Sequence, residues 1–464
     1  MPICILDRAI SGPEGTGESA GSHPVVSRFP VGMLAAMPPT PPPTPEPGEP
    51  RIRDRGDACP GALRLHPADD GRLARLRLPA GRLTARQAEV LARAAETLGD
   101  GRISITSRGN AELRGLGEGC GAELAELLAG AGLLPSPTHE RVRNIVASPG
   151  AGLDGLGRAD VQLWARELDA ALCAEPRAAS LSGRFLFLLD DGRGDVAGLG
   201  GDVSLIAGQD GSALLRLGSR GFRLAAGDAV RAALAAALAF LDAAEAAGNG
   251  AWRPHELPDE HVPDWAGALA RAGITAEPVP VPPLPASRPP APGPLGEHSL
   301  HVLAPLGRLT AAQLRALLPA DELRLTPWRG VVVVETPTDR PTDPATDLAA
   351  TDPAPTHPDR LRDLEAHGLI TRPDAPGAGV TACTGRPGCA KSLADVRADA
   401  LAAPPGPLPV HFSGCARRCG HPYGAWINVL ATGDDSYLVD GVPTPRTSLT
   451  AAVAAARGLP THTR

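Results

Sequence analysis

The stretch RLRLPAGRLTARQ, residues 75–87, decides the fold, because it recurs as HVLAPLGRLTAAQ at residues 301–313. Three matches in the same order indicate an internal repeat rather than accidental similarity in a chain rich in Ala, Arg, Leu and Gly. The other two matches are ISITSRGNAELRG (103–115) with LRLTPWRGVVVVE (323–335), and AELLAGAGLLPSP (125–137) with RDLEAHGLITRPD (362–374).

Each copy of the repeat predicts the same local structure. An alternating strand comes first, with Leu73, Leu76 and Leu78 among arginines. A helix follows, and Thr84 and Thr310 stand where its N-cap belongs. Two short strands around a Thr-Arg-Gly turn and a second helix close the unit. This β-α-β-β-α order predicts an α+β fold with two related, ferredoxin-like half-domains that pair with each other.

The rest of the chain divides around the two copies. Segments dense in proline resist helix and sheet, so we expect a disordered extension, a linker and a low-complexity insert. Two further α/β domains complete the organisation. The predicted boundaries are 1–55 (extension), 56–138 (first half-domain), 139–277 (α/β domain), 278–296 (linker), 297–372 (second half-domain, with insert 336–359) and 373–464 (α/β domain).

Composition excludes several classes of protein. Aromatic residues make up 3% and the net charge is -7, so we expect no nucleic-acid partner. No run of about 20 apolar residues predicts a membrane span. The N-terminus lacks the pattern of a secretory signal, so we expect a cytoplasmic protein whose thiols stay reduced.

Four of the eight cysteines fall in two short stretches, TACTGRPGCAKS (381–392) and HFSGCARRCGHP (411–422). The spacing C-x5-C followed by C-x3-C is off-pattern for structural zinc, and the compartment disfavours disulfides. Nearby glycines leave room for a bulky inorganic group, and nearby cations would offset its negative charge. We therefore expect an iron–sulfur cluster on Cys383, Cys389, Cys415 and Cys419. The isolated Cys4, Cys59, Cys120 and Cys173 suit ordinary packing, although Cys59 could line a site.

This cysteine signature, together with the repeat, resembles the siroheme-dependent nitrite and sulfite reductase superfamily over about residues 56–464, outside the insert. The resemblance implies two half-domains, each linked to an α/β domain, and a [4Fe–4S] cluster on the four cysteines. In that superfamily the last cysteine, here Cys419, also bridges to the siroheme iron.

Three stretches are more specific: DACPGALRLHPADDGRLARLRLPAGRL (57–83), ITSRGNAELRGL (105–116) and CGHP (419–422). They are similar to a branch of the superfamily that serves aerobic cobalamin biosynthesis. This resemblance implies an O2-dependent monooxygenase that hydroxylates precorrin-3A at C20, with an acetate arm closing a γ-lactone. It also implies an external NAD(P)H-linked electron donor and leaves room for a further non-haem iron.

A tetrapyrrole with many carboxylate arms needs several cations around it, and the arginine fork suits carboxylates best. Arg108 and Arg143 match superfamily positions that contact the cofactor or the anionic substrate. Arg75, Arg77 and Arg114 stand at strand and turn positions, where a solvated strand face is the alternative. We expect all five to bind substrate.

Two positions separate the branches of the superfamily. Sulfite reductases place two lysines around a phenylalanine, whereas the matching stretch here has Arg184, Phe185 and Leu186. Losing one cation weakens the reductase interpretation and leaves Arg184 as a candidate catalytic residue. His421, two residues after Cys419, is the other catalytic candidate, as a proton donor or an iron ligand; the alternative is a loop hydrogen bond.

Two alternatives remain open at this point. One is an assimilatory nitrite or sulfite reductase that holds siroheme as a cofactor. The other is a non-catalytic iron–sulfur electron carrier or a zinc-stabilised binding protein.

Overall fold

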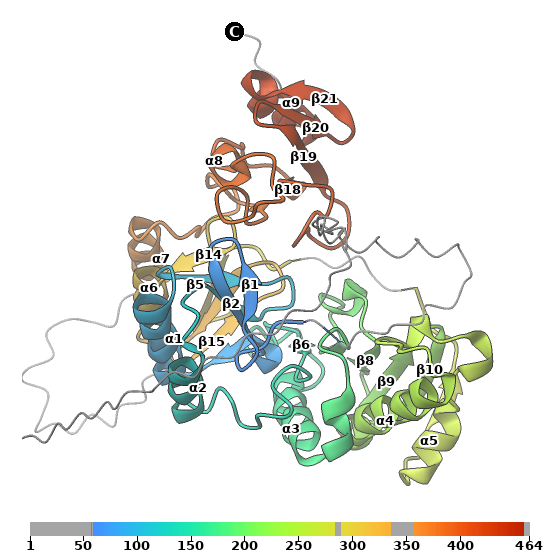
Figure 1. The fold of residues 1–464 in the computed structure, drawn as a ribbon. Coiled ribbons are helices and arrows are strands. Elements are labelled where there is room, and N and C mark those ends of the chain that lie inside the picture. Colours follow the sequence, from blue (N-terminus) through green and yellow to red (C-terminus); the bar gives the residue numbers. More distant parts are fainter. Residues whose placement is uncertain (1–56, 58, 284–288, 336–356, 459–464) are drawn as a thin grey trace, which may run out of the picture. The chain divides into compact units, whose positions relative to one another are not determined.

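The first half-domain is an antiparallel sheet with two helices. The computed structural model describes residues 57, 59–283, 289–335 and 357–458 (Figure 1). The helices are α1 (Ala85–Leu98) and α2 (Gly121–Gly130). The sheet runs in the order β1 (His66–Ala68), β2 (Gly71–Leu76), β5 (Ala111–Leu116), β4 (Arg102–Ile105) and β14 (Arg308–Thr310).

The second half-domain repeats this plan position by position. Its helices are α6 (Ala311–Ala316) and α7 (His357–Ala366). Its sheet runs in the order β12 (Gly293–Pro294), β13 (Ser299–Leu303), β16 (Gly330–Val334), β15 (Glu322–Leu325) and β3 (Arg82–Leu83). The predicted α+β fold with two pseudo-symmetric halves is therefore confirmed.

The two half-domains exchange a strand. β14 of the second copy pairs with β4 of the first, and β3 of the first copy pairs with β15 of the second. Each exchanged strand runs into a helix whose N-cap is the predicted threonine, Thr84 or Thr310, and both caps form a complete capping box. Helices α1 and α6 lie side by side (Figure 1), and one apolar core serves both sheets.

The middle α/β domain is a six-stranded sheet with its helices packed on it. Its strands β6, β7 and β8 are parallel, and the remaining strands are antiparallel. The sheet order is β11 (Glu277–Val279), β10 (Arg220–Ala225), β9 (Ser212–Leu217), β8 (Val203–Ala207), β7 (Phe187–Asp190) and β6 (Ile145–Ala147), and the helices are α3 (Val161–Ala174), α4 (Ala229–Ala247) and α5 (Trp265–Arg271).

A buried acid after β7 gives a stability prediction. Asp195 is 8% exposed and accepts a hydrogen bond from Ser148 Oγ at 2.6 Å. Burial, and then the charge of Asp190, raise the pKa of Asp195 from 3.8 to about 7. A raised carboxyl pKa gives stability that is present below about pH 4 and is lost as the pH rises through about 7.

Asp195→Asn should therefore raise the free energy of unfolding at pH 8 by up to about 4 kcal/mol, since one pKa unit corresponds to about 1.4 kcal/mol. The gain should vanish at pH 4, where the wild-type carboxyl is already neutral. Urea unfolding at the two pH values measures it, and an equal gain at both would contradict the assignment.

The C-terminal α/β domain carries the four predicted cluster ligands. β17, β18 and β19 are parallel, and β20 and β21 extend the sheet antiparallel. The order is β17 (Val380–Ala382), β18 (Val410–Ser413), β19 (Ile427–Gly433), β20 (Ser436–Val439) and β21 (Val442–Pro445), with helices α8 (Val396–Ala400) and α9 (Leu449–Ala456). An isolated β-bridge between Leu306 and Thr381 is one of the contacts between this domain and the second half-domain.

The segment predicted as a linker, 278–296, differs in part from the expectation. Both of its ends are strands: β11 adds to the sheet of the middle domain, and β12 adds to the second half-domain. The predicted extension, 1–55, lies outside the described residues. The same holds for most of the predicted insert, although its last three residues already belong to α7.

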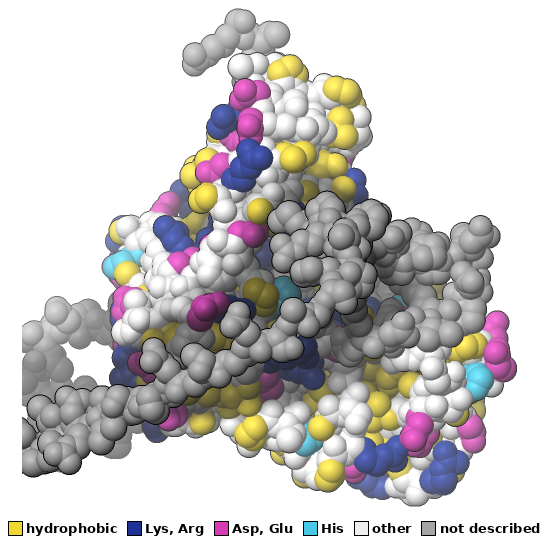
Figure 2. Space-filling view, viewed as in Figure 1, with side chains coloured by type: hydrophobic (Ala, Val, Ile, Leu, Met, Phe, Trp, Pro, Cys, Tyr) yellow, Lys and Arg dark blue, Asp and Glu magenta, His cyan; other side chains and the backbone are white. Residues whose placement is uncertain are grey.

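The described residues include no helix with the length and apolar character needed to cross a membrane. On the face in Figure 2, basic and acidic side chains are interspersed over the described residues.

Candidate active site

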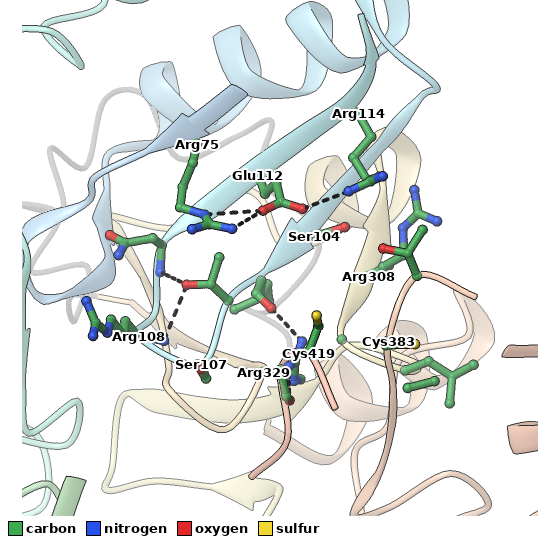
Figure 3. Close-up of a pocket in the computed structure, with 18 of the residues that line it drawn as sticks. Arg75, Ser104, Ser107, Arg108, Glu112, Arg114, Arg308, Arg329, Cys383 and Cys419 are labelled. Atoms are coloured by element: carbon green, nitrogen blue, oxygen red, sulfur yellow. Dashed lines mark hydrogen bonds and ion pairs between the residues drawn. The ribbon is translucent and has the colours of Figure 1, made fainter. Parts of the chain in front are cut away.

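Both half-domains and both α/β domains contribute residues to one cavity of about 450 Å³. The first half-domain contributes β2, β4, β5 and the turn between β4 and β5. The second contributes the turns before β14 and β16, the middle domain contributes Gly183 and Arg184, and the C-terminal domain contributes its cysteine loops. The volume is typical of a site for a small organic ligand. Figure 3 shows the arginines around this cavity, with Cys383 and Cys419 also at its wall.

The two cysteine loops follow neighbouring parallel strands. Cys383 comes directly after β17, and Cys415 comes two residues after β18. The amide of Cys383 donates to Phe412 O at 2.9 Å, and the amide of Gly414 donates to Cys383 Sγ at 3.2 Å. Because the ends of adjacent parallel strands meet at one edge, the sheet itself brings the two cysteine pairs together.

The chemistry of this donor set fits an iron–sulfur cluster. Burial raises the pKa of the Cys383 thiol, and the charges of Cys419 and Cys415 raise it further, which places these sulfurs near one another. Four sulfurs on one tetrahedral zinc ion would lie about 3.8 Å apart, given zinc–sulfur bonds of about 2.3 Å. Among the described residues, no three of these sulfurs lie within 4.8 Å of one another. In a [4Fe–4S] cluster each thiolate binds a different iron, so its four ligand sulfurs lie further apart than those of a single zinc ion.

Five predicted arginines line the cavity. Arg75 and Arg114 project from β2 and β5, and Glu112 lies between them as an ion-pair partner of both (Figure 3). Arg77 donates to the backbone oxygens of Arg141 and Gly183, at 3.1 Å each. Arg108 stands in the β4–β5 turn, and Arg184 lies over the ring of Trp252 at 4.6 Å. All five are lining residues.

The structure does not bring Arg143 to the cavity. Its side chain is 6% exposed and forms a two-pronged ion pair with Asp169 of α3, at 2.6 and 2.7 Å. A guanidinium already neutralised and held by a neighbouring carboxylate has no free prong for a ligand. We therefore correct the expected substrate-binding role of Arg143 to a structural one.

His421 is likewise outside the lining. Its ring is exposed and stacks on Trp426, with ring centres 5.2 Å apart, and Nδ1 lies 2.9 Å from Pro422 O. Two residues away, Cys419 and Gly420 do line the cavity. The loop hydrogen bond that sequence analysis kept as the alternative is therefore present, and a catalytic role for His421 has no geometric support.

Sequence reasoning missed three lining arginines: Arg308, Arg329 and Arg397. The repeat held the signal for one of them, because Arg329 takes the place in the second copy that Arg108 takes in the first. Arg308 begins the exchanged strand β14, and Arg397 comes from α8. Nothing in the sequence indicates that α8 faces a half-domain.

The cavity carries a large excess of positive charge. Glu112 is the one carboxylate among its described lining residues, against eight arginines. Three of these are paired with acids: Arg75 with Glu112, Arg114 with Asp70 and Glu112, and Arg308 with Asp100. The other five form no ion pair with any carboxylate in the described part of the chain: Arg77, Arg108, Arg184, Arg329 and Arg397.

Burial makes this excess charge costly. Burial, and then the charge of Arg75, lower the pKa of Arg77 to about 9. Burial also lowers the pKa of Arg329 and of Arg397 to about 10. Carboxylates of a ligand would relieve this cost, because a buried charge is stable only when it is paired.

In the stretch 184–186, Arg184 lines the cavity, whereas Phe185 and Leu186 lie in the core. Phe185 is fully buried and packs against the rings of Phe187 and Phe240. Leu186 is 1% exposed and belongs to a small apolar cluster, against which Trp328 and Tyr423 pack. The position where sulfite reductases have a second cation is therefore apolar core here. Cys59 does line the cavity, beside Arg77 and Arg184.

Residues 66–131 match the model of the nitrite/sulfite reductase ferredoxin-like half domain. Together with the paired half-domains and the cysteine loops, this match supports a relationship to the nitrite/sulfite reductase superfamily. A precorrin-3B synthase from Sinorhizobium sp is 27% identical over 433 residues, which cover 83% of this chain and 86% of that protein.

Two further comparisons also span most of the chain. A ferredoxin–nitrite reductase from Synechococcus elongatus is also 27% identical, over 435 residues covering 81% of this chain and 80% of that protein. The structure of the Mycobacterium tuberculosis NirA protein superimposes with a TM-score of 0.61 at 17% identity, over 85% of this chain and 82% of that one. This last likeness concerns the fold alone. Sequence identity by itself does not choose between the two activities.

Proposed function

We propose that this protein is a precorrin-3B synthase: an O2-dependent monooxygenase that hydroxylates precorrin-3A at C20, with γ-lactone formation, in aerobic cobalamin biosynthesis. One oxygen atom of O2 enters the product and the other leaves as water, with two electrons and two protons from an external NAD(P)H-linked donor.

One observation carries the proposal. The cavity beside Cys383 and Cys419 holds five arginines that form no ion pair with a carboxylate of the described residues. A tetrapyrrole with acetate and propionate arms supplies many carboxylates around a flat ring, and charge-assisted hydrogen bonds to arginine are among the strongest in proteins. The ligand would therefore complete the ion pairs that the protein leaves open.

Different residues of the chain would hold the cluster and bind the carboxylates of the substrate. Cys383, Cys389, Cys415 and Cys419 would hold the [4Fe–4S] cluster, which stores and passes single electrons when bound. Arg77 and Arg108 would hold carboxylate arms on the side of the first half-domain, and Arg329 and Arg397 on the opposite side. Arg184, oriented by Trp252, would present the remaining cation of the middle domain.

The apolar environment of Leu186 favours the oxygenase over a siroheme-dependent reductase. Reducing sulfite or nitrite consumes several protons, and a site for it gains from cations that bind the anion and keep proton donors charged. Here Leu186 is closed off by Trp328 and Tyr423, which leaves Arg184 alone in this stretch. A macrocycle that arrives as substrate needs no second cation at that position.

The decisive experiment begins with the absorption spectrum of protein purified without oxygen. We expect a broad iron–sulfur shoulder and no siroheme band. Adding precorrin-3A, a reductant and oxygen-18 gas should then give a product with one heavy oxygen atom. A siroheme band together with turnover of nitrite or sulfite would instead establish the reductase. Iron and acid-labile sulfide without either activity would leave an electron carrier.

A further inference from the structure

Two arginines of the cavity also hold the cysteine loops. Arg114 Nη2 donates to Gly388 O at 3.3 Å, and Gly388 directly precedes Cys389. Arg329 Nη2 donates to Gly420 O, and Gly420 directly follows Cys419. Each half-domain thus sends one arginine across the cavity wall to a backbone carbonyl next to a predicted cluster ligand.

The contact around Cys389 is fixed from two sides. Asp70, in the β1–β2 turn, accepts two hydrogen bonds from Arg114, at 2.9 and 2.8 Å. The neighbouring Asp69 accepts the amide of Ala390 at 2.6 Å. A Cβ at Gly388 would come within 2.9 Å of Asp70, so this approach requires glycine. Arg114 therefore cannot move without disturbing the loop of Cys389.

The contact next to Cys419 is built at a conformational cost. Arg329 has a φ of 63°, in the left-handed region that a side chain rarely adopts. In this conformation Nη1 reaches Ile105 O of the other half-domain at 2.9 Å, while Nη2 reaches the cysteine loop. Gly420 has a φ of 79°, and a Cβ there would lie 2.5 Å from Nη2. The positive φ of Arg329 and the absence of a side chain at Gly420 together permit this hydrogen bond.

We propose that Arg329 couples occupancy of the cavity to the reduction potential of the cluster; this rests on the function proposed above. A positive charge beside the cysteine loops favours the reduced cluster, because reduction adds a negative charge. A polycarboxylate ligand that pairs with Arg329 cancels that charge, whereas the guanidinium of Arg114 is already paired with Asp70 and Glu112. Ligand binding should then lower the midpoint potential and make the bound protein the stronger reductant.

The coupling between ligand binding and cluster reduction is reciprocal, so an effect on the potential implies an equal effect on ligand affinity. If the ligand lowers the potential, the oxidised protein must bind the ligand more tightly than the reduced protein, by the same free energy. Couplings of this kind typically amount to roughly 5- to 150-fold in affinity. Electrons would then be delivered at a more reducing potential when substrate is in place.

The probe for the test is sirohydrochlorin, a metal-free octacarboxylate tetrapyrrole. Its affinity is measured by fluorescence quenching for the oxidised protein and for protein reduced with dithionite. We expect the oxidised form to bind at least fivefold more tightly. Equal affinities would overturn the coupling and leave the proposed function standing, whereas a protein without a cluster or without probe binding would overturn the proposed function itself.

Variants assign the effect to Arg329. Arg329→Gln should lower the midpoint potential of the free protein and shrink the shift caused by saturating probe. Arg75→Gln is the matched control, since Arg75 lines the cavity and has no hydrogen bond to a cysteine loop among the described residues. It should weaken probe binding and keep the full shift at saturation.

Each variant is compared only when its iron and sulfide content equals that of the wild type. Where a glutamine variant loses the cluster, the affinity ratio of the wild type still decides the question. An unchanged shift in Arg329→Gln, or an equal reduction of the shift in Arg75→Gln, would contradict the assignment to Arg329.

Discussion

Cys419→Ser is expected to lose the cluster, with bound iron and acid-labile sulfide falling roughly tenfold or more. Substitutions in the outer shell of metal sites already cost roughly 10–100-fold in affinity, and removing a ligand costs at least as much. Cys383→Ser should behave alike, because both sulfurs line the same cavity wall. Iron and sulfide analysis of the purified variants, with the visible spectrum, measures the loss.

Cys173→Ser is the matched control for this result. Cys173 is a half-buried thiol near the end of α3, beside Asp169 and Arg143. It should keep the full complement of iron and sulfide. The assignment of the ligands would be contradicted if Cys419→Ser retained its cluster, or if Cys173→Ser lost it together with the other two.

Arg108→Gln and Arg143→Gln are expected to fail in opposite ways. Arg108 lines the cavity without an acidic partner in the described residues, and hydrogen bonds to charged groups contribute about 1.5–3 kcal/mol. Arg108→Gln should therefore weaken tetrapyrrole binding by about 10- to 150-fold with little change in unfolding.

Arg143→Gln should instead lower the free energy of unfolding by about 3 kcal/mol, because it leaves the carboxylate of Asp169 without its buried partner. Its tetrapyrrole affinity, measured well below the unfolding transition, should stay within about twofold of wild type. A large loss of affinity in Arg143→Gln at full stability would restore the ligand-binding role expected from sequence resemblance.

Arg108 and Arg143 also show which kinds of contact can be predicted from the sequence. The Thr-Arg-Gly turn of Arg108 is local, so its position follows from a short stretch and from the repeat. The partner of Arg143 lies 26 residues further on, in α3. A pairing between the segment before β6 and the later helix α3 depends on how they pack, and neither residue's own neighbourhood encodes it.

The distinction between local contacts and tertiary packing also explains which other sequence predictions succeeded and which features were missed. Capping boxes at Thr84 and Thr310 depend on residues three apart, and sequence analysis placed both caps correctly. The exchanged strands β3 and β14 have two and three residues, too few for any periodicity to show. Arg397 enters the cavity only through the packing of α8 against the half-domains, which is a purely tertiary fact.

The exchange of β3 and β14 has a consequence for how this site arose. Neither half can complete its own sheet, so the pair has the architecture of a homodimer with swapped strands, written into a single chain. Once the two copies were fused, they no longer had to be identical. The turn of the second copy is one residue longer, and of the two turn arginines only Arg329 donates to a cysteine loop among the described residues. The two sides of the cavity therefore differ, and an asymmetric ligand would meet different groups on each side.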